Sequence, residues 1–207
     1  VQSYIGKLQE PLTSLINKKI VNLSENETAT HHDCRHPSKR DHLNELKQFI
    51  QDVHNHSITI NEKPIKAICQ IGIGGSINGP QTICHCLDSW GYKKKIPFVF
   101  ISNHDEAHIA SELANINIHE TLFIIASKSG KTIEVSKAVS EIINQHSLNE
   151  SFFYANQCIT ITTENSALNS TQYLKSFILN TSIGGRYSTT SPIGLLILGL
   201  AFGESVI

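Results

Sequence analysis

The 207-residue sequence contains no methionine, one tryptophan, and no C-x-x-C pair among its five cysteines. No apolar run approaches the roughly 18 residues that a membrane-spanning helix needs, and the most apolar stretch, "GLLILGLAFG" (194–203), is typical of a buried helix. The formal net charge is −1, which argues against a surface built for nucleic acid or for an anionic membrane. We therefore predict neither partner.

The first residues, "VQSYIGKLQE", lack the charged start and apolar core of a secretory signal. Because the chain starts at Val1 and has no methionine, we expect a piece of a longer polypeptide. Cys69 and Cys158 fall inside apolar runs, as reduced thiols of a cytoplasmic protein do. The groups "HHDCRH" (31–36) and "CHC" (84–86) lack the spacing of paired zinc ligands, so we predict no metal, and we predict no cofactor.

Hydrophobic residues make up 40% and charged residues 17% of the chain, an ordinary composition for a globular protein. Apolar residues at helical spacing predict a helix over 41–55, with Asp41 as its cap. We interpret residues 1–60 as a mostly helical lead-in packed on a domain formed by residues 61–207.

Short apolar runs alternate with helix-like segments from residue 64 onward. The runs predicted as strands are 65–72, 97–102, 121–127, 158–162 and 176–180. Helices are predicted over about 79–89 and over 106–114, and another is predicted to begin near Ser191. A further helix is predicted after the third strand, and its apolar face is formed by Ile133, Val135, Ala138, Val139, Ile142 and Ile143. Because the runs are continuously apolar and helices are expected between all of them, we predict an α/β protein whose doubly wound parallel sheet is flanked by helices.

Three loops of unusual composition leave the ends of predicted strands: "GIGGSINGP" (72–80), "SKSGKTIE" (127–134) and "TSIGGRYS" (181–188). Ligands of doubly wound sheets bind beyond the carboxyl ends of the strands, so we expect these loops to face one crevice. In the first loop, glycines would let the backbone approach an anion, although a tight turn with close helix packing is an alternative. Ile77 stands where the dinucleotide fingerprint G-x-G-x-x-G needs glycine.

The second loop contains "SGKT", which is similar to the end of a nucleotide-binding loop, G-x-x-x-x-G-K-[ST]. Ile125 stands where that motif needs its first glycine, so a triphosphate loop is not expected. The hydroxyls of Ser127, Ser129 and Thr132, followed by a helix N-terminus, instead favour a cradle for a single phosphate group. Ordinary capping of the helix by serine or threonine is the alternative interpretation.

Arg186 follows two glycines in the third loop. A guanidinium only donates hydrogen bonds and stays charged, so it could stabilise an oxyanion formed in a reaction. A surface salt bridge is the more ordinary use of a single arginine.

Together these segments resemble the phosphoglucose isomerase family from about residue 20 to residue 203. "IGIGGSINGP" resembles its I-G-I-G-G-S-x-x-G-P, "HETLFIIASKSGKTIE" its E-T-L-F-I-x-x-S-K-[ST]-x-T-T-x-E, and "SIGGRYSTTSPIGL" its V-G-G-R-[YF]-S-x-x-[ST]-x-[IV]-G-L. "NLSENETATHHDCRH" resembles the stretch ending in H-x-x-L-R, and "FISNHDEAHIASEL" resembles F-x-S-N-x-D-x-x-x-[IL]. The chain has Ile77-Asn78 where the family usually has Asp-Leu, Lys131 where it usually has Thr, and Gly130 where many members have Phe.

The resemblance implies a sugar isomerase (SIS) domain, a flavodoxin-like, five-stranded parallel sheet. It implies a homodimeric enzyme of glycolysis and gluconeogenesis that interconverts glucose 6-phosphate and fructose 6-phosphate through ring opening and a cis-enediolate. It assigns phosphate binding to residues of the first two loops: Gly75, Ser76, Ser127, Lys128, Ser129 and Thr132. It assigns stabilisation of the enediolate to Arg186.

The family's ring-opening histidine, glutamate base and late lysine lie in segments downstream of this chain. Glu204 lacks the E-S-N-G-K context of the base, and no catalytic role is assigned to it or to His31. A fragment of the isomerase that binds hexose phosphate without turnover is therefore the main hypothesis. A non-catalytic SIS-domain sensor or regulator of phosphosugars and a nucleotide-binding protein are the alternatives.

Overall fold

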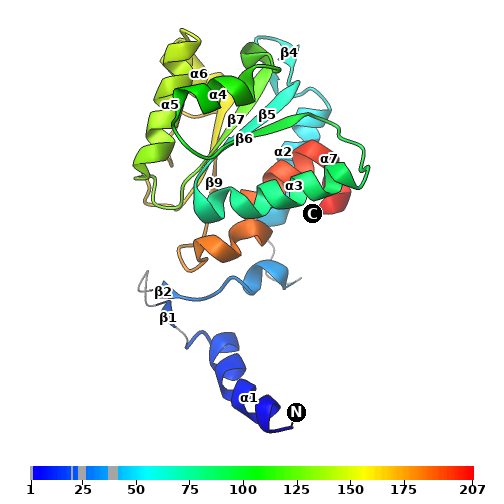
Figure 1. Ribbon diagram of the computed structural model, residues 1–207, viewed down its shortest axis with the longest axis vertical. Helices are drawn as coiled ribbons and strands as arrows, with labels where there is room; N and C mark the ends of the chain where they lie inside the picture. The colour runs from blue at the N-terminus through cyan, green and yellow to red at the C-terminus, as the bar shows by residue number, and fades with distance from the viewer. Residues whose placement is uncertain (1, 20, 23–26, 37–41) are drawn as a thin grey trace.

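The computed structural model describes residues 2–19, 21–22, 27–36 and 42–207 of the chain (Figure 1). Its α-helices are α1 (Gln2–Ile16), α2 (His42–His54), α3 (Asn78–Ser89), α4 (Glu106–Leu113), α5 (Ile133–Gln145), α6 (Glu150–Gln157) and α7 (Pro192–Phe202). Its strands are β1 (Val21–Asn22), β2 (Glu27–Thr28), β3 (Thr59–Ile60), β4 (Lys63–Pro64), β5 (Ala67–Ile71), β6 (Phe98–Ile101), β7 (Thr121–Ala126), β8 (Cys158–Thr162) and β9 (Lys175–Ile178). The 3-10 turns include η3 (Gly74–Ser76) and η5 (Gly185–Thr190).

Five of the strands form one sheet in the order β6-β5-β7-β8-β9, and every neighbouring pair is parallel. This confirms the predicted α/β fold. The three central strands are buried along their whole length, whereas the edge strands β6 and β9 are partly exposed. Continuously apolar sequence is therefore explained by helices that cover both faces of the sheet.

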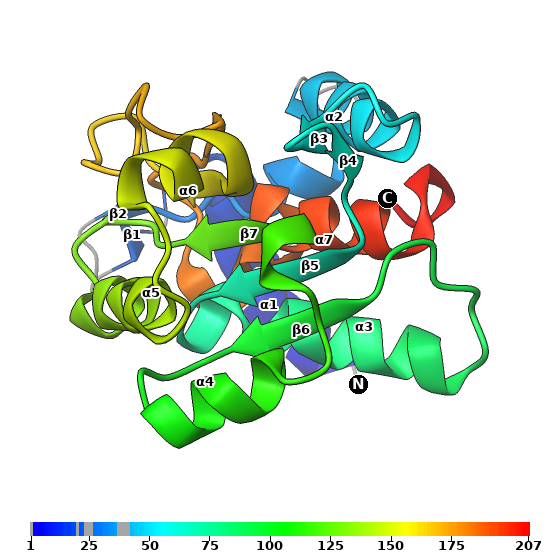
Figure 2. The same ribbon diagram turned by 90° about the horizontal axis from the view of Figure 1, so that it is seen from above.

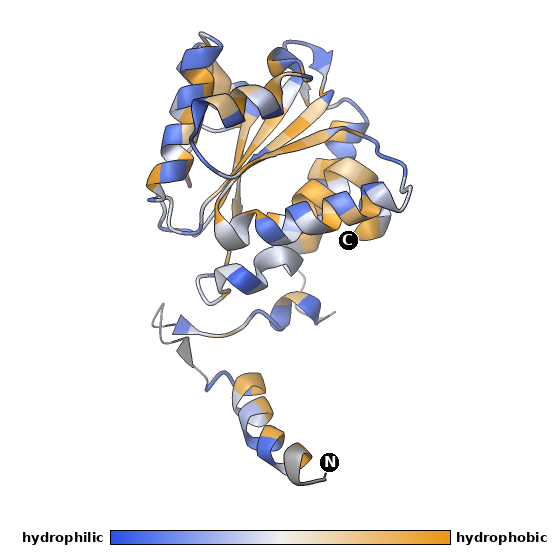
Figure 3. Ribbon diagram, viewed as in Figure 1, coloured by the Kyte–Doolittle hydropathy of each residue, from blue (hydrophilic) through white to orange (hydrophobic). Residues whose placement is uncertain are grey.

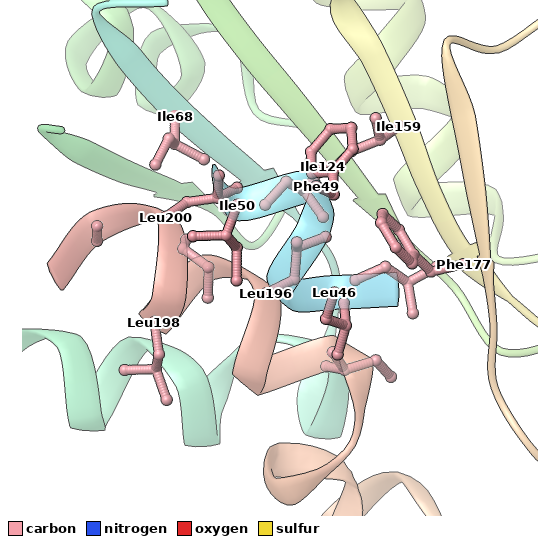
Figure 4. Packing of buried hydrophobic residues seen from close by; sticks show 14 of the residues in the cluster. Leu46, Phe49, Ile50, Ile68, Ile124, Ile159, Phe177, Leu196, Leu198 and Leu200 are labelled. Carbon is pink, nitrogen blue, oxygen red and sulfur yellow. The ribbon is translucent and has the colours of Figure 1, made fainter. Parts of the chain in front are cut away.

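The two helical layers pack on opposite faces of this sheet (Figures 1 and 2). Because side chains alternate along a strand, Ile68 points to one face and Cys69 to the other. Helices α2, α3 and α7 cover the first face, where Leu46 and Ile50 of α2 meet Leu196 of α7 (Figure 4). Helices α4, α5 and α6 cover the second face. Helix α7 is apolar on all sides because it lies at the centre of its layer (Figure 3).

Burial of the cysteine side chains matches their predicted use as core residues. Cys69, Cys84 and Cys158 are buried, and burial raises the pKa of Cys84 to about 12. The pKa of Cys69 and of Cys158 is also raised, chiefly by burial. Thiols with such pKa values stay protonated and unreactive at neutral pH.

The connection between β8 and β9 corrects the predicted alternation of strand and helix. Residues 163–174 form turns and no helix. The segment is rich in serine, threonine and asparagine, whose side chains compete for backbone partners. The hydroxyl of Ser166 accepts from the amide of Leu168, and Asn169 Nδ2 donates to the carbonyl oxygen of Glu164 (2.8 Å).

Two helices, α5 and α6, instead connect β7 to β8. Helix α6 was not predicted; Asn149 caps it by accepting from the amide of Phe152. On α5, the predicted buried face is correct except at Ile133, which is 64% exposed. Ile133 lies two residues before Val135, slightly more than half a turn around the helix, and so points away from the core.

The N-terminal part of the chain contains α1 and the short pair β1–β2. Helix α1 projects away from the sheet (Figure 1), and its apolar side chains Ile5, Leu8, Leu12 and Ile16 are exposed. Helix α2 packs against α7 within the main core, and the predicted cap Asp41 lies outside the described residues. The predicted boundary near residue 60 stays a prediction.

In the described part of the chain, no helix has the length and apolarity to cross a membrane.

Neighbouring phenylalanines on α6 test the layered core. Phe153 is fully buried against Phe123 (ring centroids 4.9 Å apart), whereas Phe152 is 38% exposed. Phe153→Ala should lower the free energy of unfolding by about 3–5 kcal/mol, because it leaves a cavity in the core. Phe152→Ala should lower it by less than about 1 kcal/mol. Urea denaturation measures both, and equal losses would contradict the burial described for α6.

Candidate functional site

A cavity of about 470 Å³ lies at the carboxyl ends of β5 and β7. Its walls come from the turn that follows β5, the loop that follows β7, the loop that follows β8 and the N-terminal strand β2. Among the predicted site residues, those that line it are Ser76, Ser127, Lys128, Ser129 and Thr132. This is the edge at which doubly wound sheets bind ligands.

The hydroxyl groups of the second loop converge on one another. Ser127 Oγ and Thr132 Oγ1 lie 2.9 Å apart, and Ser127 Oγ also accepts from the amide of Gly130 (3.2 Å). Ser129 Oγ accepts from the amide of Lys131 (3.2 Å). The Ser129 hydroxyl only accepts in this bond, so its proton remains available to a ligand.

Helix α5 begins directly after Thr132, which occupies the N-cap position without a side-chain capping bond. Ordinary capping therefore does not account for this hydroxyl. The first amides of a helix have no partners within the helix, and they carry a partial positive charge. Together with the side chain of Lys128, this makes one wall of the cavity rich in hydrogen-bond donors.

The backbone of the second loop is held in place by Thr162, the last residue of β8, and by Thr163, which follows it. Thr162 Oγ1 donates to the carbonyl oxygen of Ser127 (2.7 Å), and Thr163 Oγ1 donates to that of Lys128 (3.0 Å). Gly130 has a φ of +66°, and a Cβ there would overlap the hydroxyl of Ser166. Thr162 and Thr163 thus form a platform that holds the carbonyl oxygens of Ser127 and Lys128 in place. Side chains of the loop line the cavity.

The first and third loops meet through their backbones. A Cβ on Gly75 would overlap the carbonyl group of Gly185, and Ser188 Oγ is placed to donate to the carbonyl oxygens of Gly75 (3.0 Å) and Gly185 (2.7 Å). Gln70, fully buried in β5, donates to the carbonyl oxygen of Ser76 (2.8 Å). These contacts place the first loop beside the turn that carries Arg186.

Arg186 itself is exposed and does not line the cavity, and neither does Gly75. Next to Arg186, Tyr187 stacks on His31 with ring centroids 4.1 Å apart. Burial lowers the pKa of His31, and the positive charges of Arg35 and His32 lower it further. A neutral imidazole is therefore favoured on this tyrosine ring.

Sequence reasoning missed three polar residues of the cavity wall, Glu27, Thr163 and Thr181. Thr181 is the first residue of the third loop identified above, and Thr163 follows a predicted strand in the same way, so the rule that groups these loops covers both positions. Glu27 carries no such signal, because β2 reaches the cavity through contacts distant in sequence. Among the described residues, no group of three or more histidine, cysteine, aspartate and glutamate side chains could hold a metal ion. Ile125 lies buried within β7, so no nucleotide-type loop precedes Gly130.

The fold and the cavity define a doubly wound α/β protein with a cavity at the carboxyl edge of its sheet. Residues 9–206 match the family model described as phosphoglucose isomerase. The chain belongs to the phosphoglucose isomerase family.

Curated relatives agree with this assignment. The glucose-6-phosphate isomerase of Borreliella afzelii is 36% identical over 98% of this chain and 42% of the relative, and that of Treponema denticola is 36% identical over 97% and 41%. The chain thus spans well under half the length of the curated relatives it matches.

Solved structures are similar as well. A glucose-6-phosphate isomerase from Chlamydia trachomatis superposes with a TM-score of 0.74 at 26% identity, covering 87% of this chain and 36% of that one. A hypothetical protein from Thermus thermophilus superposes with a TM-score of 0.72 at 23% identity, covering 96% and 45%, which supports the fold alone. The predicted SIS-type fold is confirmed.

The contact between the first and third loops can be tested from its two sides. Gly75→Ala should lower the free energy of unfolding by about 1–3 kcal/mol, because its methyl group would be forced into the Gly185 backbone. In Gly185→Ala, the one described atom within 4 Å of the new Cβ would be Gly75 Cα, at 3.9 Å, so that variant should lose less than about 1 kcal/mol. Urea denaturation distinguishes them, and an equal effect would contradict the described approach.

Proposed function

We propose that this chain is the phosphosugar-binding part of an enzyme that interconverts glucose 6-phosphate and fructose 6-phosphate. Ser76, Ser127, Ser129 and Thr132, with Lys128, would hold the 6-phosphate, and the Gly75 backbone would support Ser76. The observation that carries the proposal is the convergence of these predicted residues on one cavity at the sheet edge. The curated relatives bear the name of that isomerase, which gives the substrate class.

The donor-rich wall suits a phosphate dianion. Phosphate oxygens accept hydrogen bonds, and hydroxyl protons, helix amides and an ammonium group are all donors. The free amide groups at a helix N-terminus can bind such an anion without a full positive charge on every contacting group. The platform of Thr162 and Thr163 keeps this wall arranged before the ligand arrives.

Arg186 would act at the other end of the sugar, where the enediolate forms. It lies outside the cavity wall, on the turn that is held against the first loop. A positioned donor of this kind typically contributes about 3 kcal/mol to lowering a barrier. The ring-opening histidine, the glutamate base and the late lysine would come from parts of the enzyme outside this chain. The homodimeric parent and its cytoplasmic location stay predictions.

The phosphate cradle is tested by removing two of its hydroxyls. Ser129→Ala combined with Thr132→Ala should weaken the binding of glucose 6-phosphate by about 2–4 kcal/mol, because each hydrogen bond to a charged group contributes roughly 1.5–3 kcal/mol. Isothermal titration calorimetry measures the change. Ser111→Ala, exposed on α4 and lining neither this cavity nor the pocket beside it, is the matched control and should bind normally. Unchanged affinity in the double variant would reject the cradle.

The division of labour is tested by assaying the 207-residue chain itself. It should bind glucose 6-phosphate and yet show no enzyme-like conversion to fructose 6-phosphate, because the proposed base lies elsewhere. A coupled assay for fructose 6-phosphate, run at a ligand concentration that calorimetry shows to be saturating, measures this. Turnover at an enzyme-like rate would show that the base is within the chain.

A further inference from the structure

Among the described residues that line the cavity, Glu27 is the acidic one, and the others are serines and threonines, one lysine and two apolar residues. It lies on β2 and is half-buried. In an ordinary anion site a carboxylate would be unfavourable, because like charges repel. Glu27 must therefore contact a part of the ligand other than its phosphate group.

The position of Glu27 is set by contacts of the segment that follows it. The Thr30 amide donates to the carbonyl oxygen of Ser182 (3.1 Å), and the hydroxyls of these two buried residues are hydrogen-bonded to each other. One residue further on, His31 stacks on Tyr187. The N-terminal segment is thus tied to the third loop, and these ties bring β2 to the cavity beside Thr181.

The cavity is larger than its phosphate wall requires. Its volume of about 470 Å³ falls in the range of sites for whole small molecules, roughly 300–1,000 Å³. A phosphate group has five heavy atoms and fills the space of only a few water molecules, each of about 30 Å³. Most of the cavity is therefore left for the remainder of the ligand.

The hydroxyl wall after β7 and the opposite side with Glu27 suit different parts of a ligand. An ionised glutamate only accepts hydrogen bonds, and phosphate oxygens offer it no donor. The hydroxyl groups of a sugar are donors. We propose that Glu27 accepts hydrogen bonds from sugar hydroxyls and so determines specificity for a phosphorylated polyol over other phosphate anions; this rests on the phosphosugar function proposed above.

The test compares two ligands that share the phosphate group and differ in hydroxyls. Calorimetry gives the affinities of the 207-residue chain for glucose 6-phosphate and for inorganic phosphate at equal ionic strength. Glu27→Ala should reduce the preference for glucose 6-phosphate by roughly ten- to a hundredfold, the factor to which one hydrogen bond to a charged group typically corresponds. Affinity for inorganic phosphate should stay unchanged or rise, because a nearby negative charge is removed. Glu27→Gln, of the same shape, should change the preference in the same direction by less.

Glu164→Ala is the matched control, since Glu164 is exposed on the loop after β8 and does not line the cavity. It should leave the preference between the two ligands unchanged. If Glu27→Ala tightens both ligands by the same factor, or if Glu164→Ala has the same effect, Glu27 is only a repelling charge and the inference is wrong, while the phosphate cradle stands. If the unmodified chain binds neither ligand, the proposed function fails and the inference fails with it.

Discussion

The backbone contact between Gly75 and Gly185 is the constraint on which the rest of the site depends. A Cβ on Gly75 would overlap the carbonyl group of Gly185, and Ser188 is placed to donate to the carbonyl oxygens of both glycines. The contact joins segments that are distant in the sequence and sets the first loop, with Ser76, beside the turn that carries Arg186. The same turn also receives the N-terminal segment through Tyr187 and His31. The first loop and the N-terminal segment are therefore both held to this turn, and the hydroxyl wall opposite them is held by Thr162 and Thr163.

Local sequence patterns are sufficient to predict the sheet and most of the hydroxyl groups that line the cavity. Continuous apolar runs identify buried parallel strands, and their carboxyl ends must share one edge, so the loops after them can be grouped from the sequence alone. The same patterns fail where the signal is weak or distant. The turns of 163–174 compete with helix through their own side chains, and α6 is short, with its apolar residues only weakly segregated to one face.

Glu27 shows the limit of sequence reasoning most clearly. Its place in the cavity depends on pairing between Thr30 and Ser182, residues 152 positions apart, which no local pattern encodes. The prediction that Ile133 lies on the buried face of α5 was wrong for a simpler reason, because its position around the helix, rather than its apolar character, decides its exposure. The hydroxyls of Ser127 and Thr132 could be predicted as a group, but their mutual bond and the threonine platform beneath them could not.

The central claim is that the hydroxyl wall after β7 holds the phosphate group of a hexose 6-phosphate. A crystal structure of the 207-residue chain with glucose 6-phosphate tests this most directly. The account predicts phosphate oxygens within hydrogen-bond distance, about 2.7–3.2 Å, of the hydroxyls of Ser127, Ser129 or Thr132, with the sugar directed toward Glu27 and Thr181. A phosphate group bound elsewhere on the chain, or the sugar bound against this wall with the phosphate pointing out, would contradict it.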